Sequence, residues 1–295
     1  MRPGNHRAAV RGALFLGFTC FLIVTYPAVC AFGWGARRWI RRIWSRYTCW
    51  LLDIRVRARG TPSTTVPTLF VPNHVSYLDV VIVGRFIDAL FIAKAEVGGW
   101  PLFGYIARVT GTLFVKRHWR QARIQRDLLV ERMREGESFV LFAEGTSSNG
   151  LGVKPFKTSL LSPIEPWVAR RPVAAQAVTL GYLRLADGTP ISTANCDTHA
   201  WYDDMEFAPH LWDVMKHGGL DVEVVFHEPV PSSAVTSRKV LGPQLRAEFS
   251  DRLAGMRAGV AAEPAAAGQR TPQGHAPMPQ GGPRARACSE SDLRL

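Results

Sequence analysis

The sequence predicts an α/β domain with a mixed, largely parallel sheet flanked by helices, preceded by an N-terminal membrane-anchoring helical segment. Three observations support this prediction. Within residues 54–259, short apolar runs that fit strands alternate with longer segments that fit helices. Residues 13–33 carry no charged side chain. Residues 34–53 combine arginine and tryptophan at helical spacing.

The uncharged segment 13–33 is long enough to cross a bilayer, because about 20 apolar residues span the hydrocarbon core as a helix. It follows a basic arm at 1–12, which carries three arginines and no acidic residue. A cleaved signal peptide shares the basic start, but the dense Arg/Trp stretch that follows favours a retained anchor. Pro27 would kink a spanning helix, so a re-entrant insertion is the alternative to a full span.

Residues 34–53 predict a basic amphipathic helix in the membrane interface. Aromatic and aliphatic residues recur every three or four positions, and arginine fills much of the rest. A helix packed in the core, with solvated arginines, is the alternative. Because more arginines follow the apolar segment than precede it, a spanning segment would leave the following domain in the cytoplasm.

The distribution of charge argues against nucleic acid as a partner. The formal net charge is +12, of which residues 1–12 contribute +3 and residues 34–60 contribute +7. A nucleic-acid-binding protein would place its basic face on the folded domain. Basic residues on both sides of an apolar segment instead indicate anionic membrane lipids as the partner.

The main domain, predicted at residues 54–259, contains a regular series of strands and helices. The predicted strands are 54–58, 68–71, 90–93, 112–115, 138–142, 173–180 and 220–226, and the predicted helices are 77–88, 121–135 and 240–256. Beyond them, residues 260–295 contain no Phe, Trp or Tyr and predict a disordered tail. The five cysteines show neither a Cys-x-x-Cys pair nor a metal-ligand spacing, so we expect no disulfide framework and no metal site.

The run Asn-His-Val-Ser-Tyr-Leu-Asp at 73–79 follows a predicted buried strand. In a continuous helix His74 and Asp79 would point about 140° apart, so they can meet only if His74 lies in a turn before the helix. Ser76 is a good N-cap residue, and its spacing to Asp79 fits a capping box. Asp79 therefore either caps the helix, or orients His74 to remove a proton from a hydroxyl group, and the two interpretations are compatible.

Three further runs stand at predicted strands. Residues 111–117 end in Lys116 and Arg117, two cations suited to phosphate, although a solvated strand end is the alternative. Residues 142–150 lead into a Gly/Ser/Asn loop whose backbone N–H groups can point at an anion or an oxyanion, and which alone would be an ordinary turn. Residues 171–178 predict a core strand.

Taken in this order, the four runs resemble the motifs of the glycerolipid acyltransferase family, which includes bacterial 1-acyl-glycerol-3-phosphate acyltransferase. The family motif Asn-His-x-Ser-x-x-Asp is matched at every fixed position, and the resemblance covers roughly residues 50–230. The matching residues are Asn73, His74, Ser76, Asp79, Gly111, Phe114, Val115, Arg117, Phe142, Glu144, Gly145, Thr146 and Ser148. In the fourth motif, Ala177 stands at the position expected for a proline.

The resemblance implies an O-acyltransferase in which His74 is the general base and Asp79 orients it. The implied acceptor is a lysophospholipid hydroxyl, first of all that of 1-acyl-sn-glycerol-3-phosphate, which would give phosphatidate. The implied donor is a fatty acyl thioester of coenzyme A or acyl carrier protein, used as a co-substrate without any cofactor or metal. It also implies the inner (cytoplasmic) membrane of a bacterium, with the catalytic domain facing the cytoplasm. The implied substrate-binding residues are Asn73, Ser76, Lys116, Arg117, Glu144, Gly145 and Thr146.

One departure from the family pattern concerns the acceptor. Ser147 stands where the family motif has an arginine that helps to bind the acceptor phosphate. Its absence leaves acyl transfer intact but opens an alternative acceptor, such as lyso-ornithine lipid or another lysolipid. Alternatively, Lys154 or Lys157 supplies the missing cation.

Two other classes of function compete with an acyltransferase. A non-catalytic lipid-binding membrane module would keep the fold but tolerate the loss of His74 and Asp79. A serine hydrolase would need a Gly-x-Ser-x-Gly sequence around its nucleophile, which this sequence lacks.

Overall fold

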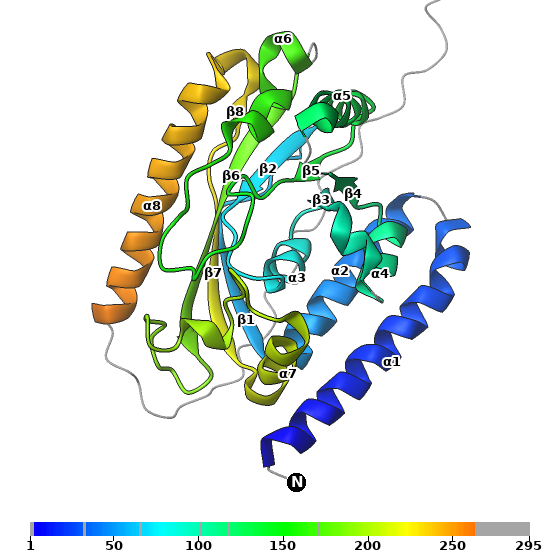
Figure 1. Cartoon of the computed structure of the whole chain (residues 1–295), viewed down its shortest axis with the longest axis vertical. Coiled ribbons are helices and arrows are strands. Elements are labelled where there is room, and N and C mark those ends of the chain that lie inside the picture. The colour runs from blue at the N-terminus through cyan, green and yellow to red at the C-terminus, as the bar shows by residue number, and fades with distance from the viewer. Residues whose placement is uncertain are drawn as a thin grey trace, which may run out of the picture. The chain divides into compact units, whose positions relative to one another are not determined.

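A computed structural model of the chain describes residues 3–31, 34–64, 67–100, 102–116, 119–169 and 172–262. Its strands form a single sheet with helices on both faces (Figure 1). The strands are β1 (Ile54–Arg59), β2 (Thr68–Pro72), β3 (Leu90–Lys94), β4 (Leu113–Val115), β5 (Phe139–Val140), β6 (Ala174–Leu185), β7 (Leu220–Phe226) and β8 (Val230–Pro231). Most of the predicted tail, from residue 263 onward, lies outside the described residues.

The helices differ widely in length. The α-helices are α1 (Pro3–Ala31), α2 (Trp34–Leu51), α3 (Leu78–Gly84), α4 (Phe103–Val109), α5 (Trp119–Arg134), α6 (Pro166–Ala169), α7 (Phe207–His217) and α8 (Arg238–Ala262). Four short 3₁₀ helices join them, namely η1 (Ala95–Gly99), η2 (Thr158–Ile164), η3 (Cys196–Thr198) and η4 (Ser232–Ala234). The helix predicted at 77–88 ends at Gly84, where α3 passes so close to α2 that an added Cβ would lie 2.6 Å from the Ser45 hydroxyl.

The sheet is mixed and largely parallel, as the sequence predicts. Its order is β1-β7-β6-β2-β5-β3-β4, and β8 pairs with β6. The five strands from β6 to β4 run parallel to one another, and β1 runs parallel to β7. Only the β6–β7 and β6–β8 pairings are antiparallel among the described strands. The direction therefore reverses once across the sheet, between β6 and β7.

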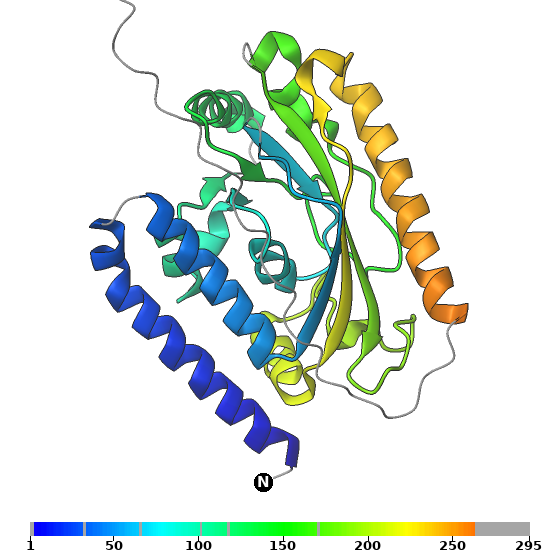
Figure 2. The ribbon, with the colours of Figure 1, turned by 180° about the vertical axis from the view of Figure 1, so that it is seen from behind.

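Two apolar cores cover the two faces of the sheet. Alternate residues of β2 point to opposite faces, with Phe70 in one core and Leu69 and Val71 in the other. Helices α1, α2, α3 and α7 pack on the Phe70 side, and α8 covers the opposite face (Figures 1 and 2). Both faces of the central strands are therefore buried, which explains their continuous apolar sequences.

Residues 3–12 of the basic arm and residues 13–31 of the apolar segment form one helix, and residues 1, 2, 32 and 33 lie outside the described residues. Gly4–Tyr26 is long and apolar enough to cross a membrane, judged by length and composition alone. Along its length α1 packs on α2 and α7, with the Trp44 indole N–H donating to Thr19 Oγ1 at 3.2 Å and Arg11 donating to the Met215 carbonyl at 3.0 Å.

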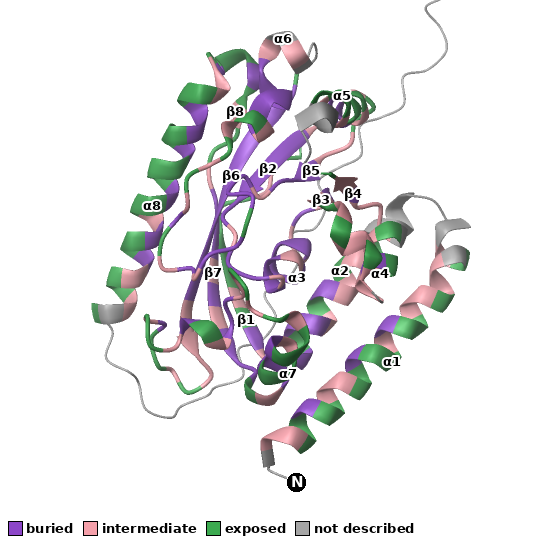
Figure 3. Cartoon of the chain, in the orientation of Figure 1, coloured by how far each residue is buried: buried purple, intermediate pink, exposed green. Residues whose placement is uncertain are grey.

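Helices α1 and α2 both carry exposed residues (Figure 3), and several of these are large apolar or tryptophan side chains. Phe21 and Val24 of α1 are 60% and 77% exposed, and Trp39 and Trp50 of α2 are 63% and 71% exposed. Apolar and tryptophan side chains on one surface are typical of helices that enter a membrane interface. The full span and the shallow insertion of segment 13–33 both stay predictions.

The packing of α8 on the sheet yields a test of the fold. Phe249 is fully buried on α8, whereas Val240 on the same helix is 49% exposed. Because truncation leaves a cavity, Phe249→Ala should lower the free energy of unfolding by about 3–5 kcal/mol. The control Val240→Ala should change it by less than about 0.5 kcal/mol. Denaturant unfolding in detergent measures both, and equal effects would contradict this packing.

Candidate functional site

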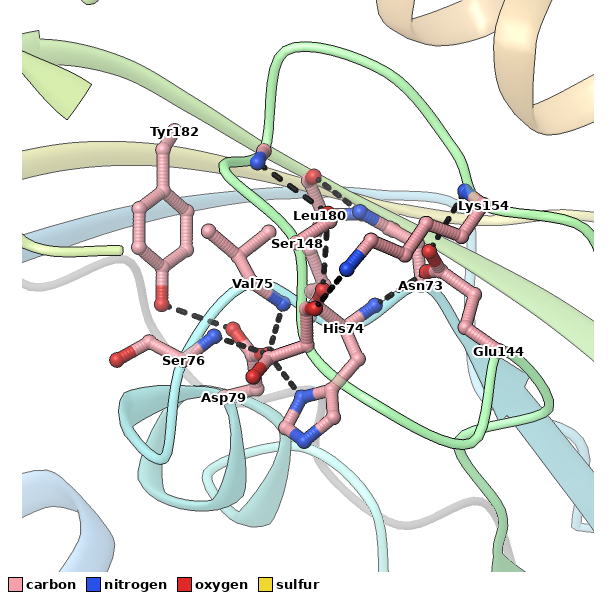
Figure 4. A network of polar contacts seen from close by, with 12 residues as sticks. Asn73, His74, Val75, Ser76, Asp79, Glu144, Ser148, Lys154, Leu180 and Tyr182 are labelled. Carbon is pink, nitrogen blue, oxygen red and sulfur yellow. Dashed lines mark hydrogen bonds and ion pairs between the residues drawn. The ribbon is translucent and has the colours of Figure 1, made fainter. Parts of the chain in front are cut away.

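The site lies where β2 leaves the sheet and turns into α3 (Figure 4). Asn73 fixes the point of departure, since its side-chain amide donates to the Leu180 carbonyl at 3.0 Å and its Oδ1 accepts from the Leu180 N–H at 2.7 Å. The side chain therefore pairs with β6 as a strand neighbour would. These contacts are structural, and direct binding of substrate by Asn73 stays a prediction.

His74 and Asp79 meet as the spacing argument requires. His74 lies in the loop before the helix, Asp79 lies in the first turn of α3, and His74 Nδ1 is 2.8 Å from Asp79 Oδ2. The imidazole is 19% exposed, and the carboxylate is fully buried. The ring of Phe142 stacks on the imidazole, with 4.0 Å between ring centroids and planes 20° apart. Phe142 therefore covers one face of the imidazole ring, and Asp79 holds its Nδ1 atom.

The buried carboxylate of Asp79 receives hydrogen bonds on both oxygens. Oδ2 accepts from the backbone N–H groups of Val75 at 2.7 Å and Ser76 at 3.0 Å, and Oδ1 accepts from the Tyr182 hydroxyl at 2.8 Å. Burial and the neighbouring Asp79 raise the pKa of Tyr182 well above its ordinary value, so this hydroxyl stays a donor. Such donors favour the charged carboxylate in a buried site.

A charged Asp79 selects the tautomer of His74. Since Oδ2 is an acceptor, Nδ1 carries the proton and Nε2 keeps its lone pair. No described residue forms a hydrogen bond with Nε2. This nitrogen is therefore available to take a proton from a bound molecule.

The capping prediction is half right. Asp79 accepts from the backbone N–H of Ser76, as the acidic residue of a capping box does. However, the N-cap position of α3 is Tyr77, and the buried Ser76 hydroxyl has no hydrogen-bond partner among the described residues. The predicted capping role of the Ser76 side chain is wrong, because the Asp79 backbone N–H, which its hydroxyl would accept from, donates to the Ser76 backbone carbonyl at 3.1 Å.

Glu144, in the run at 142–150, is hydrogen-bonded to the run at 73–79. Its Oε1 accepts from the His74 backbone N–H and its Oε2 from the Lys154 backbone N–H, each at 2.7 Å. Ser148 closes the same junction, because its backbone N–H donates to the His74 carbonyl at 2.9 Å. Burial raises the pKa of Glu144 to about 7, although the two backbone donors act to lower it. Glu144 therefore positions the loop that carries His74.

The remaining predicted binding residues differ in how far they are exposed to solvent. Gly145 has a φ of +73°, which favours glycine, and the Lys157 side chain lies so near that an added Cβ would be 2.8 Å from its Cδ. Thr146 and Lys116 are exposed, and Arg117 lies outside the described residues. Binding of substrate by these residues stays a prediction.

Two residues of the site, Tyr182 and Asp203, carry no signal in the sequence. Tyr182 on β6 reaches Asp79 from a strand more than 100 positions away. The Lys154 ammonium donates to the Ser147 carbonyl at 2.9 Å and pairs with Asp203 Oδ1 at 3.3 Å. Of the two lysines considered for the missing arginine, Lys154 is the one that reaches residue 147. Periodicity cannot reveal such contacts, because they join segments that only the fold brings together.

An apolar pocket of about 230 Å³ adjoins the His74 loop. Its walls come from α1, α2, α3, α4, α7 and β3. Tyr77 and Phe91 both line it, and the Phe91 ring stacks on Phe142, which in turn covers His74. The Phe91 and Phe142 rings therefore lie between the pocket and the imidazole of His74, and the pocket extends to the N-terminal helices. Within the described residues, no three His, Cys, Asp or Glu side chains are placed to hold a metal ion.

Comparison with known proteins shows the family of this chain. Residues 53–168 match the acyltransferase family. The lyso-ornithine lipid O-acyltransferase of Rhizobium meliloti is 35% identical over 245 residues, which cover 80% of this chain and 84% of that protein. The chain belongs to the acyltransferase family. The 1-acyl-sn-glycerol-3-phosphate acyltransferase of Neisseria gonorrhoeae is 32% identical over 180 residues, which cover 59% of this acyltransferase and 65% of that one.

A solved structure shows the same fold. The crystal structure of the 1-acyl-sn-glycerophosphate acyltransferase PlsC from Thermotoga maritima aligns with a TM-score of 0.57 at 19% identity. The alignment covers 85% of this acyltransferase and 98% of that chain. The bacterial relatives and the apolar helix α1 fit association with a membrane.

Glu144 makes the stability of this acyltransferase depend on pH. Its pKa is raised from 4.5 to about 7 in the folded protein, so between these values the folded state holds a proton that the unfolded state has lost. Stability from this group is therefore full below pH 4.5 and is lost as the pH rises through about 7.

The test compares wild type with Glu144→Gln, which cannot ionise. Melting temperatures measured from pH 5 to 8 should show wild type losing stability relative to the variant as the pH rises. A difference that is constant with pH would contradict the raised pKa.

Proposed function

We propose that this acyltransferase moves a fatty acyl group from a thioester to the free hydroxyl of a lysolipid, with His74 as general base and Asp79 as its orienting partner. One observation carries the proposal. The 2.8 Å contact between His74 Nδ1 and the buried Asp79 carboxylate leaves Nε2 without a hydrogen-bond partner among the described residues, and Tyr77 of the same loop lines an apolar pocket. A positioned base next to room for an acyl chain is what this reaction needs.

The chemistry follows from this geometry. Nε2 of His74 takes the proton of the acceptor hydroxyl as its oxygen attacks the thioester carbonyl carbon. Asp79 stabilises the imidazolium that forms, since its charge is 2.8 Å from Nδ1. When the carbon–sulfur bond breaks, His74 returns the proton to the departing thiolate. The ester forms directly, without a serine or cysteine nucleophile. General-base help of this kind typically contributes about 10²–10⁴-fold.

The apolar pocket is suited to the acyl chain. Its lining is almost entirely aliphatic and aromatic, and it lies between the domain and helices α1 and α2. A chain bound there would pass from the base toward the surface that we propose enters the membrane. The donor carrier would be coenzyme A or acyl carrier protein, and its thioester carbon would stop beside His74.

The acceptor that best fits is lyso-ornithine lipid. Ser147 replaces the family arginine, and the relatives from Rhizobium meliloti and Brucella abortus, at 35% and 37% identity, are lyso-ornithine lipid O-acyltransferases. Lysophosphatidate is the second candidate. It is supported by the intact Asn-His-x-Ser-x-x-Asp motif and by relatives at 32% identity from Neisseria that act on 1-acyl-sn-glycerol-3-phosphate.

We further propose that the enzyme works on the cytoplasmic face of the inner membrane, where α1 and α2 anchor it. The exposed apolar side chains of α1 and the exposed tryptophans of α2 support this placement. Anionic lipid headgroups would pair with the arginines of α2, and the lipid acceptor would reach the site without leaving the membrane.

Removing the base tests the proposed mechanism. His74→Ala should lower kcat for acyl transfer from acyl-CoA by about 10²–10⁴-fold, and Asp79→Asn should have a similar effect, because each disables the oriented imidazole. The control His217→Ala replaces an exposed histidine on α7 and should keep full activity. Vesicle flotation should show unchanged membrane binding in all three variants. Full activity in His74→Ala would contradict the proposal in favour of another base, whereas no acyl transfer by the wild type would favour a non-catalytic lipid-binding module.

Filling the pocket tests its assignment to the acyl chain. Ala107 on α4 lines the pocket, so Ala107→Phe should shift donor preference toward shorter acyl chains. Each buried methylene is worth about 0.8 kcal/mol, so excluding two should change the preference by roughly tenfold. The matched control is Ala208→Phe at an exposed position of α7. Rates with acyl-CoA of graded length measure both, and an unchanged length profile in Ala107→Phe would place the chain elsewhere.

A further inference from the structure

We propose that Lys154 and Asp203 determine acceptor specificity by selecting a lipid headgroup that carries an anionic and a cationic group together. The inference rests on the acyl transfer proposed above and assigns two positioning residues to the acceptor side of that same site. Neither residue belongs to the motifs that identify the family, and only the fold brings them together.

The pair is fixed beside the His74 loop by two independent connections. From one side, Glu144 bridges the backbone N–H groups of His74 and Lys154, each at 2.7 Å. From the other side, the Trp201 backbone N–H donates to the Val75 carbonyl at 3.0 Å, which anchors the segment that carries Asp203. The two charged side chains then meet at 3.3 Å between Lys154 Nζ and Asp203 Oδ1.

The Lys154 ammonium lies beside Ser147, the residue that stands where the family motif has an arginine. It extends back from its own backbone toward the 147–148 loop and donates to the Ser147 carbonyl at 2.9 Å (Figure 4). An ammonium has three N–H donors, and the described residues provide acceptors for two of them. The third donor can take an anionic oxygen of a bound headgroup. Lys154 thus restores one cation at this place.

Asp203 makes this cation different from a free arginine. Its carboxylate neutralises much of the Lys154 charge, and it would repel a phosphate monoester that approaches the ammonium. The pair is open to solvent, with side chains 37% and 68% exposed, so solvent weakens it and either partner can be exchanged. A headgroup with a carboxylate and an ammonium can replace both partners at once, whereas a dianionic phosphate satisfies only Lys154 and meets Asp203 as a like charge.

The backbone adds evidence that Asp203 is held in place. Its φ is +49°, a left-handed conformation that Asp and Asn tolerate better than most residues. The neighbouring Asp204 is also exposed but contacts no described cation. Asp203→Asn therefore removes the charge without straining the loop, and Asp204→Asn is a matched control for the same change in net charge.

The test compares two acceptors in each variant. Purified wild type, Asp203→Asn, Asp204→Asn and Lys154→Gln would be supplied with acyl-CoA and either lyso-ornithine lipid or lysophosphatidate, and kcat/KM measured for both. Asp203→Asn should shift the ratio of the two kcat/KM values toward lysophosphatidate by roughly fivefold, mainly through KM, the size of effect that a partly exposed charge supports. Asp204→Asn should leave the ratio at its wild-type value. Lys154→Gln should lower kcat/KM for both acceptors, since each presents an anion.

The outcomes separate this inference from the proposed function. If wild type acylates either lipid and Asp203→Asn has the same acceptor ratio as Asp204→Asn, the selectivity assigned to Asp203 is wrong while acyl transfer stands. An equal loss with both acceptors in Asp203→Asn indicates a structural role and also overturns the inference. A wild type that acylates neither acceptor overturns the proposed function and this inference with it.

Discussion

The site depends on one buried negative charge. Asp79 has no contact with solvent, and a carboxylate in such a place stays charged only if hydrogen-bond donors replace the lost water. The donors come from three parts of the chain, namely the imidazole of His74, the backbone N–H groups of the loop that follows it, and the Tyr182 hydroxyl on β6. Because the loop wraps this carboxylate, the same interaction shapes the turn and orients the histidine.

The sheet explains how these groups stay in register. β2 and β6 are parallel neighbours, and the Asn73 amide extends their pairing one residue beyond the end of β2. The loop therefore leaves the sheet beside Leu180 of β6. Two residues further along β6, the Tyr182 hydroxyl donates to the Asp79 carboxylate. Glu144 then fixes the loop after β5 to the same place through backbone N–H groups. The loop that carries His74 is positioned by hydrogen bonds to its main chain, and Nε2 of His74 has no partner among the described residues.

The residues proposed to select the acceptor and the helices proposed to enter the membrane lie on different parts of the molecule. The apolar pocket is bounded by α1 and α2, so the helices proposed to enter the membrane also form the wall of the proposed acyl site. The Lys154–Asp203 pair lies on the loops beyond the sheet, where exchange of a few residues alters charge without disturbing either core. An acyltransferase with an unchanged base can therefore acquire a different acceptor.

Much of this protein could be predicted from local sequence. Buried strands such as β7, found at Leu220–Phe226, and long helices such as α5 and α8 have periodic apolar patterns that tertiary contacts only reinforce. The meeting of His74 and Asp79 follows from their spacing, since a helix starting between them is the one arrangement that joins them. Short helices such as α4 and α7 could not be predicted from the sequence. A helix of seven to eleven residues shows too little periodicity and depends on packing for its stability.

What only the tertiary structure decided is the set of contacts between distant segments. Tyr182 is 103 positions from Asp79, and Asp203 is 49 positions from Lys154, so no local pattern links either pair. The unused hydroxyl of Ser76 also shows that the turn is organised by the carboxylate and not by the serine. The sequence by itself determined the family, and it pointed to His74 and Asp79 as the proposed base and its partner. The fold decided which charged and polar groups surround His74 and Asp79, because the distance in space between two side chains does not follow from their separation along the chain.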